Sequence, residues 1–255
     1  MTTTLANLKT RPAIAPLFGK KALVIGGSRG IGAAIVERLS AEGAAVAFTY
    51  NGGVAAAEAL AAALDRTVAI RADSSDEAAL AAAVEQAAQQ WGGIDILVYN
   101  AGILTRGTVD EVSLADFDRV YAINVRGAYI AVQAASRHLS EGGRIIFIGS
   151  NVAERANFAG TSAYVTSKAA IAGLARGLAQ DFAPRRITVN TVQPGPTATD
   201  MNPVDSGHYD AVRDFVPLGR YGEPAEIGAL VAHIAGPEAG FITGAAFTID
   251  GGFSI

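Results

Sequence analysis

Hydrophobic positions follow two alternating patterns along the chain. Short runs that are almost entirely apolar, such as residues 94–98 and 144–148, are typical of strands covered on both faces of a sheet. In the longer stretches between them, apolar residues such as Ile31, Ile35 and Leu39 recur every four positions, as on one helix face. The pattern predicts strands over residues 20–26, 44–50, 67–73, 94–102, 143–150, 186–195 and 247–252, and helices over 31–43, 54–64, 77–91, 113–138, 162–182 and 224–236.

This alternation predicts the fold class. Strands that alternate with helices form βαβ units, which build a parallel sheet with helices on both faces. We therefore expect an α/β fold, a single doubly wound domain over residues 19–255 with a seven-stranded parallel sheet. Residues 1–18 are expected to form a flexible N-terminal extension. The polar, Pro-marked residues 199–218 are expected to form a substrate flap, because long loops in compact domains are often functional.

Composition narrows the classes of partner. Half of the 255 residues are hydrophobic, and 24 acidic against 20 basic side chains give a net charge of −4. Nucleic acid and anionic membranes are not expected as partners, since both need clustered positive charge. No stretch is long and apolar enough to span a membrane and no secretory pattern is present, so we expect a soluble, cytoplasmic protein. The chain has no Cys, and His138, His208 and His233 lack metal-ligand spacing, so no metal site is expected.

A glycine-rich segment lies where the first predicted strand ends and the first predicted helix begins. Glycine allows a tight turn and a close approach of backbone to a pyrophosphate, and the helix N-terminus offers free N–H groups. This is the pattern of a Rossmann dinucleotide site, with candidate residues Gly26, Ser28, Arg29, Gly30, Ile31 and Gly32. The second strand ends in Tyr50 and Asn51, without the carboxylate that usually holds the ribose of NAD. Because Arg29 can pair with a 2′-phosphate, we expect the cofactor to be NADP(H).

Tyr164 and Lys168 lie four positions apart in a predicted helix and so share one face. A phenol with a pKa near 10 is a poor acid or base at neutral pH, and a neighbouring ammonium lowers that pKa. Ser150 ends a predicted strand, at the sheet edge where ligands bind in open α/β folds. The three residues predict proton-transfer chemistry beside the dinucleotide.

Further motifs lie in the same order along the chain: Asp73-Ser74, Tyr99-Asn100-Ala101-Gly102, Asn124 in Asn-Val-Arg-Gly, and Pro194-Gly195-Pro196-Thr197-Ala198-Thr199. With the glycine loop, Ser150, Tyr164 and Lys168, they resemble the short-chain dehydrogenase/reductase family from about residue 20 to residue 252. Three departures from the family pattern stand out. Ile25 stands where Thr is usual, Tyr99 stands where Asn is usual, and Ser150 and Tyr164 are 14 positions apart, one more than the commonest spacing.

The resemblance implies the roles of these residues. NADPH would deliver hydride to a ketone, Ser150 would bind the carbonyl oxygen, and Tyr164 would donate the proton. Lys168 would lower the pKa of Tyr164 and hold the nicotinamide ribose, and Asn124 would anchor a relay water. The cofactor would also contact Tyr50, Asn51, Asp73, Ser74, Asn100, Ala101, Gly102, Tyr164, Lys168, Pro194, Gly195, Thr197 and Thr199. The substrate pocket is expected to be lined by Asn151, Val152, Phe158 and Met201.

Other functions stay open at this point. One is a 3-oxoacyl-carrier-protein reductase, for which Arg185 and Arg186 would dock an acidic carrier while Glu141 would oppose it. Another is a regulator on the same fold, since several stretches are similar to family members that bind cyclic-di-GMP and act in biofilm dispersal; its partner would be a cyclic dinucleotide. A scaffold protein would not need the four catalytic-type residues. The resemblance also implies a homodimer or homotetramer, formed through the helices at 113–138 and 161–182 and the C-terminal strand.

Overall fold

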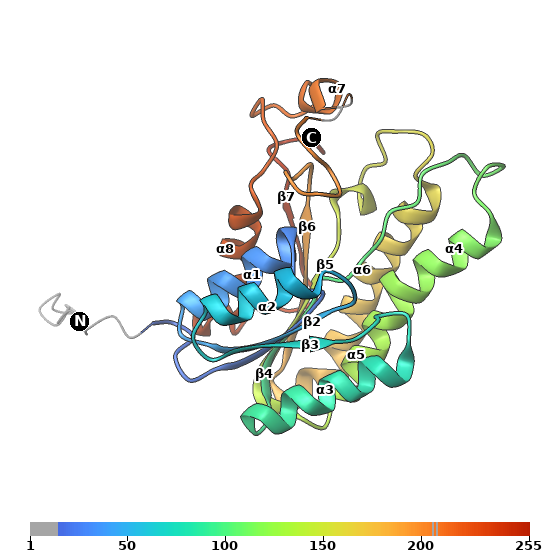
Figure 1. The fold of residues 1–255 in the computed structure, drawn as a ribbon. Coiled ribbons are helices and arrows are strands. Elements are labelled where there is room, and N and C mark those ends of the chain that lie inside the picture. Colours follow the sequence, from blue (N-terminus) through green and yellow to red (C-terminus); the bar gives the residue numbers. More distant parts are fainter. Residues whose placement is uncertain (1–14, 206, 208) are drawn as a thin grey trace, which may run out of the picture.

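The computed structural model describes residues 15–205, 207 and 209–255. Its centre is one seven-stranded sheet in the order β3-β2-β1-β4-β5-β6-β7, with every neighbouring pair parallel (Figure 1). The strands are β1 (Lys21–Ile25), β2 (Ala45–Tyr50), β3 (Thr67–Arg71), β4 (Ile94–Tyr99), β5 (Leu139–Ile148), β6 (Thr188–Pro194) and β7 (Ala246–Ile249). The predicted α/β class and the seven-stranded parallel sheet are confirmed.

Helices cover both faces of the sheet (Figure 1). One face carries α1 (Gly30–Ala41), α2 (Val54–Ala63) and α8 (Pro224–Ala235), and the other carries α3 (Glu77–Trp91), α4 (Leu114–Tyr121), α5 (Gly127–Ala135) and α6 (Ser162–Phe182). Short 3-10 turns lie at Asn151–Ala153 (η2), Ala183–Arg185 (η3) and Pro237–Ala239 (η4). Consecutive strands β1, β2 and β3 run to one side and β4 onward to the other, so the order reverses beside β1. In such sheets ligands bind at this reversal, outside the carboxyl ends of the strands.

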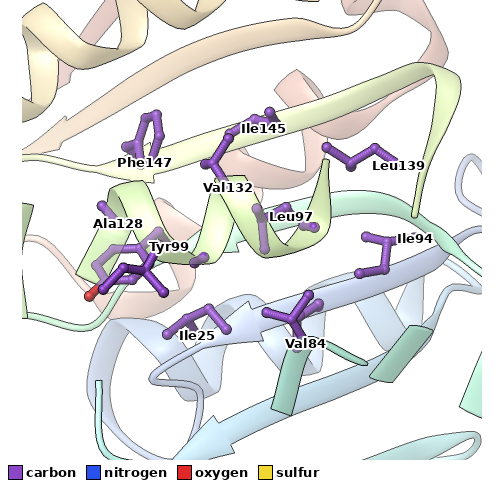
Figure 2. Packing of buried hydrophobic residues seen from close by; sticks show 14 of the residues in the cluster. Ile25, Val84, Ile94, Leu97, Tyr99, Ala128, Val132, Leu139, Ile145 and Phe147 are labelled. Carbon is purple, nitrogen blue, oxygen red and sulfur yellow. The ribbon is translucent and has the colours of Figure 1, made fainter. Parts of the chain in front are cut away.

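Two hydrophobic clusters, one on each face, form the core. On one face Ile25, Leu97, Tyr99, Ile145 and Phe147 of the central strands pack against α3 and α5 (Figure 2). On the other face α1 and α8 pack against the alternate side chains of the same strands. The central strands need apolar residues at successive positions because both of their faces are covered. This explains the continuous apolar runs in the sequence.

The helix expected over residues 113–138 is not continuous. It is divided into α4 and α5 by η1 (Ala122–Arg126), a turn of π-helix that contains the buried Asn124. Such turns are uncommon and occur frequently at functional sites. The period of apolar residues carries no sign of this interruption.

The expected N-terminal extension and flap are each attached more firmly than predicted. Residues 1–14 lie outside the described residues, but Leu17 is fully buried in the cluster beneath α1 and donates its N–H to Glu42 O at 2.9 Å, so an extension reaching residue 18 is wrong. The flap contains a short helix, α7 (Tyr209–Arg213). Its end packs on the C-terminal segment, because Val216 is buried and a Cβ on Gly251 would lie 2.7 Å from Val216 Cγ1.

Candidate active site

The glycine loop joins β1 to the N-terminus of α1. Gly26 has φ +80°, and a Cβ at this position would lie 2.9 Å from the backbone of Ala101. A Cβ on Gly32 would overlap Gly26 O and lie 2.6 Å from Asn100 Nδ2. The loop is therefore closed to any side chain at these positions, while α1 begins at Gly30 and presents its first N–H groups at this end of the strands. Such a cradle fits the pyrophosphate of a dinucleotide.

Neighbouring strands hold the loop in this shape. Gly26 N–H donates to Thr49 Oγ1 at 2.9 Å, and Asn100 Nδ2 donates to Gly26 O at 2.6 Å. A hydroxyl is lost from the loop because Ile25 stands where Thr is usual, and Thr49 of β2 supplies one from the adjacent strand. The sequence interpretation missed Thr49. The only sign of Thr49 in the sequence is that it is a hydroxyl residue near the end of an otherwise apolar strand, where the structure buries it.

The residues predicted to contact the adenosine end of the cofactor lie at the ends of β2 and β3 and in the glycine loop. Asn51 Nδ2 donates to Asp73 Oδ2 at 2.9 Å, so these two predicted cofactor residues lie together. Hydrogen bonds from the Ser75 backbone and side chain hold the pKa of Asp73 below its usual value. Arg29 is exposed and has no ion-pair partner within residues 15–205, 207 and 209–255, and no carboxylate follows Tyr50. The guanidinium is thus available to an anionic ligand.

The four residues predicted to be catalytic come from three places beyond the ends of β4 and β5. Asn124 lies in η1, Ser150 follows β5, and Tyr164 and Lys168 lie one turn apart on α6. Lys168 Nζ lies 5.6 Å from the centroid of the Tyr164 ring, and the Ser150 side chain is close enough to the Tyr164 phenol to influence its pKa. The Asn124 side chain and the Lys168 amine both lie beside Gly102. A Cβ there would lie 3.4 Å from both Asn124 Oδ1 and Lys168 Nζ.

Burial sets the protonation of Tyr164 and Lys168. It raises the pKa of the Tyr164 phenol to about 12, with the Ser150 side chain acting in the opposite direction. It also lowers the pKa of the Lys168 ammonium to about 8; Lys168 Nζ donates to Ile148 O at 2.9 Å. In the absence of a ligand Tyr164 is therefore a neutral donor at pH 7. Any lowering of its pKa has to come from the Lys168 charge and from bound groups.

The segment 194–199 borders the site across from the glycine loop. A Cβ on Gly30 would lie 3.3 Å from Thr199 Cγ2, so the loop and this segment lie against each other. A Cβ on Gly195 would overlap Asp250 Cβ, and Thr197 is buried with its hydroxyl donating to Gly195 O at 3.0 Å. Pro194 ends β6 and is also buried. The predicted nicotinamide-contacting residues thus border the same space as the phosphate cradle.

The residues predicted to contact the substrate differ in how far their side chains are exposed. Asn151 is only 3% exposed, and its Nδ2 donates to Asp250 Oδ2 at 3.3 Å and to Ser254 Oγ at 3.2 Å, so its side chain is engaged by the C-terminal segment. Val152 is partly buried, and Met201 is 53% exposed. Phe158 is exposed on one side and packs on Phe215 and Phe253 with ring centroids 5.5 and 6.1 Å away. The sequence interpretation missed Asp250 and Phe253, because their contacts with this loop are visible only in the folded chain.

Neither a metal centre nor a membrane-spanning helix is found within the described part of the chain. No group of three or more His, Cys, Asp or Glu side chains there is arranged to hold a metal ion. No helix there is long and apolar enough to cross a membrane.

The phosphate cradle, the neutral phenol and the buried amine together define a dinucleotide-dependent oxidoreductase. A family model described as enoyl-(acyl carrier protein) reductase matches residues 25–254. The chain belongs to the short-chain dehydrogenase/reductase family.

Known relatives agree with this assignment over nearly the whole chain. The cyclic-di-GMP-binding biofilm dispersal mediator protein of Escherichia coli is 48% identical over 235 residues, which are 92% of this chain and 97% of that protein. A short-chain dehydrogenase/reductase from Serratia marcescens has a TM-score of 0.93 at 54% identity, covering 94% of this chain and 100% of its own. A short chain dehydrogenase from Burkholderia cenocepacia, solved in complex with NADP, has a TM-score of 0.93 at 50% identity with the same coverage.

Proposed function

We propose that the protein is an NADPH-dependent reductase of a ketone. The observation that carries the proposal is that Lys168 lies beside the Tyr164 ring and, with Asn124, beside Gly102, next to a phosphate cradle closed to side chains. A structural relative that holds NADP supports the choice of cofactor. When bound, the dihydronicotinamide supplies the hydride.

The side chains of the site would divide the remaining work. The Ser150 hydroxyl donates a hydrogen bond to the substrate carbonyl oxygen and orients it toward Tyr164. The Tyr164 phenol, protonated up to about pH 12 in the free protein, gives its proton to the oxygen as alkoxide charge develops. The Lys168 ammonium then stabilises the phenolate that is left, and its position near Asn124 provides a route for proton return.

The test is NADPH oxidation by the purified protein with a panel of diketones, quinones, ketoesters and acetoacetyl thioesters. Tyr164→Phe should abolish turnover of every active member while NADPH still binds, measured by the fluorescence of the reduced cofactor. Turnover that survives in Tyr164→Phe would refute the assignment of the proton donor. Phe158→Leu, which alters the exposed aromatic cluster and no proton-transfer group, serves as the matched variant and should change which ketones are accepted.

The proposed preference for NADPH over NADH depends on Arg29. Its exposed guanidinium lies at the start of α1, and β2 ends without a carboxylate. Arg29→Ala should raise KM for NADPH about tenfold or more and leave KM for NADH within about twofold, since only NADPH carries the phosphate. Arg38→Ala, which removes another arginine of α1 paired with Glu42, provides the control. Equal effects on both cofactors would refute the role of Arg29.

A second candidate function is regulation by a cyclic dinucleotide. The observation that favours it is the 48% identity to a cyclic-di-GMP-binding protein over 97% of that protein's length. Calorimetric titration of the protein with cyclic-di-GMP, with and without saturating NADPH, tests it. Tight binding that NADPH does not displace would support a separate regulatory site, and absence of heat at micromolar protein would reject the function.

The contacts of Arg185 and Arg186 do not favour a docking surface for an acidic carrier protein. Arg186 is paired with Glu141 at 2.9 Å, and Arg185 donates to the backbone carbonyls of Ser136 and Leu139. Both cations are therefore engaged within the chain. Acetoacetyl thioesters in the panel above test this alternative directly.

We also propose that two copies associate through α4, η1 and α6. Together with the start of α5, these elements enclose an apolar hollow of about 700 Å³, lined by Tyr121, Val125, Tyr129 and Leu174 among others. An apolar hollow of this kind on a protein surface marks an interaction site. Light scattering after gel filtration should give a dimer or tetramer for the wild type and a smaller species for Val125→Arg; a monomeric wild type would refute the association.

A further inference from the structure

We propose that Tyr99 is a positioning residue, whose hydroxyl holds the π-helical turn η1 and with it Asn124 in the geometry that the active site requires. The inference rests on the proposed reductase function for its effect on turnover. It concerns the position where the motif of the family usually begins with Asn, and where this chain has an aromatic side chain instead.

The phenol reaches the turn from the last residue of β4. Its ring is 2% exposed and packs within the buried cluster between the sheet and α5 (Figure 2). The hydroxyl donates to Ile123 O at 2.5 Å. Burial raises the pKa of this phenol far above its usual value, so it keeps its proton and its role as donor throughout the working range of the protein.

This hydrogen bond acts on the peptide group that leads into Asn124. Ile123 O belongs to the peptide unit between Ile123 and Asn124, so the phenol fixes the orientation of that plane. A π turn is less favourable than continuous α-helix and persists where tertiary contacts stabilise it. The Tyr99 hydroxyl is one such contact, and it comes from a rigid central strand.

The side chain of Asn124 is held at the same time by the segment that follows β4. Its Oδ1 accepts from Ile103 N–H at 2.9 Å, and its Nδ2 donates to Ile103 O at 3.0 Å and to Ser167 Oγ at 3.0 Å. Tyr99 and Ile103 are only four residues apart, so one short stretch of chain holds both the backbone and the side chain of Asn124. The Ser167 hydroxyl in turn donates to Tyr164 O at 2.8 Å, which extends the network to the proton donor.

Gly127 independently supports this role, because the absence of a side chain at this position leaves room for the Tyr99 hydroxyl. A Cβ at this position would overlap Tyr99 Oη and lie 2.6 Å from Ser74 O. Glycine inside a continuous helical run, as here between η1 and α5, destabilises it by about 1 kcal/mol relative to alanine. This loss of helix stability is offset because the missing Cβ leaves room for the Tyr99 hydroxyl beside η1.

The first test compares Tyr99→Phe with Val132→Ala. Val132 lies on α5 in the same buried cluster and is 2% exposed, so its truncation weakens the same packing without touching η1 (Figure 2). We expect kcat for ketone reduction to fall about ten- to a hundredfold in Tyr99→Phe, with KM for the ketone and Kd for NADPH within about twofold, because misplacement of catalytic groups acts mainly on turnover. In Val132→Ala, kcat should change by less than about twofold. Equal kcat losses in the two variants would overturn the proposal.

The second test needs no activity. Hydrogen–deuterium exchange of the Ile103 amide, which donates to Asn124 Oδ1, is followed by NMR in the cofactor-free protein. Exchange should be at least about tenfold faster in Tyr99→Phe and in Gly127→Ala, which displaces the hydroxyl, and unchanged in Val132→Ala. Unchanged exchange in Tyr99→Phe would overturn the positioning role. If the wild type reduces no ketone, the proposed function fails, and the Ile103 exchange alone decides whether Tyr99 holds Asn124.

Discussion

Lys168 should make the stability of the cofactor-free protein rise between pH 8 and pH 10. The side chain is 5% exposed, and burial lowers its pKa from 10.5 to about 8. Within this interval the unfolded chain still binds the proton, whereas the folded chain has released it. The unfolded state therefore holds more protons, and the free energy of unfolding increases with pH.

The size of the effect follows from the shift. Each pH unit contributes about 1.4 kcal/mol where the two states differ by one proton, so the two units up to pH 10 give about 2–3 kcal/mol. Above pH 10 Tyr164 acts in the opposite direction. Burial raises its pKa from 10.0 to about 12, so the unfolded chain loses that proton first and stability falls. Stability of the wild type should pass through a maximum near pH 10.

Guanidinium unfolding at pH 8, 9 and 10, followed by the fluorescence of Trp91, measures this rise. The matched variant is Lys168→Met, which keeps the side-chain length and removes the titrating group. The neighbouring Tyr164 keeps its proton in the folded chain over this interval, because its pKa is about 12, so the difference between the two pH profiles reports Lys168. Parallel profiles from pH 8 to pH 10 would show that Lys168 is not desolvated in the folded chain and would refute the reasoning.

Three further changes test other parts of the structure. Gly32→Ala should weaken NADPH binding by more than about a hundredfold in a fluorescence titration, because its Cβ would overlap Gly26 O; Gly177→Ala on α6 has open space and should instead raise the free energy of unfolding by about 1 kcal/mol. Leu17→Ala should lower the free energy of unfolding by about 2–5 kcal/mol in denaturant titration, and a loss under 1 kcal/mol would show that this segment is not packed. Asp76→Ala removes the N-cap that accepts from Ala79 N–H at 3.0 Å and should destabilise α3 by about 1 kcal/mol, with no effect on NADPH binding.

The order and type of most helices and strands could be predicted from the amino-acid sequence. Continuous apolar runs, as in β4 and β5, are a local property of strands that are covered on both faces, and helical spacing in α1 is equally local. The glycine loop could be predicted for the same reason, since its chemistry needs adjacent residues. Ser150, Tyr164 and Lys168 followed from short motifs and from the rule that ligands bind at the carboxyl ends of parallel strands.

Tertiary structure alone decided how these residues are supported. Asn151 turns inward because its partner Asp250 lies 99 positions away, and Thr49 supplies a hydroxyl to Gly26 from the next strand. Within the π turn that contains Asn124, the carbonyl of Ile123 accepts a hydrogen bond from Tyr99, 24 positions earlier in the chain. Hydrogen bonds between distant segments leave no periodic trace in the sequence, because they form only when packing of the sheet brings their partners together.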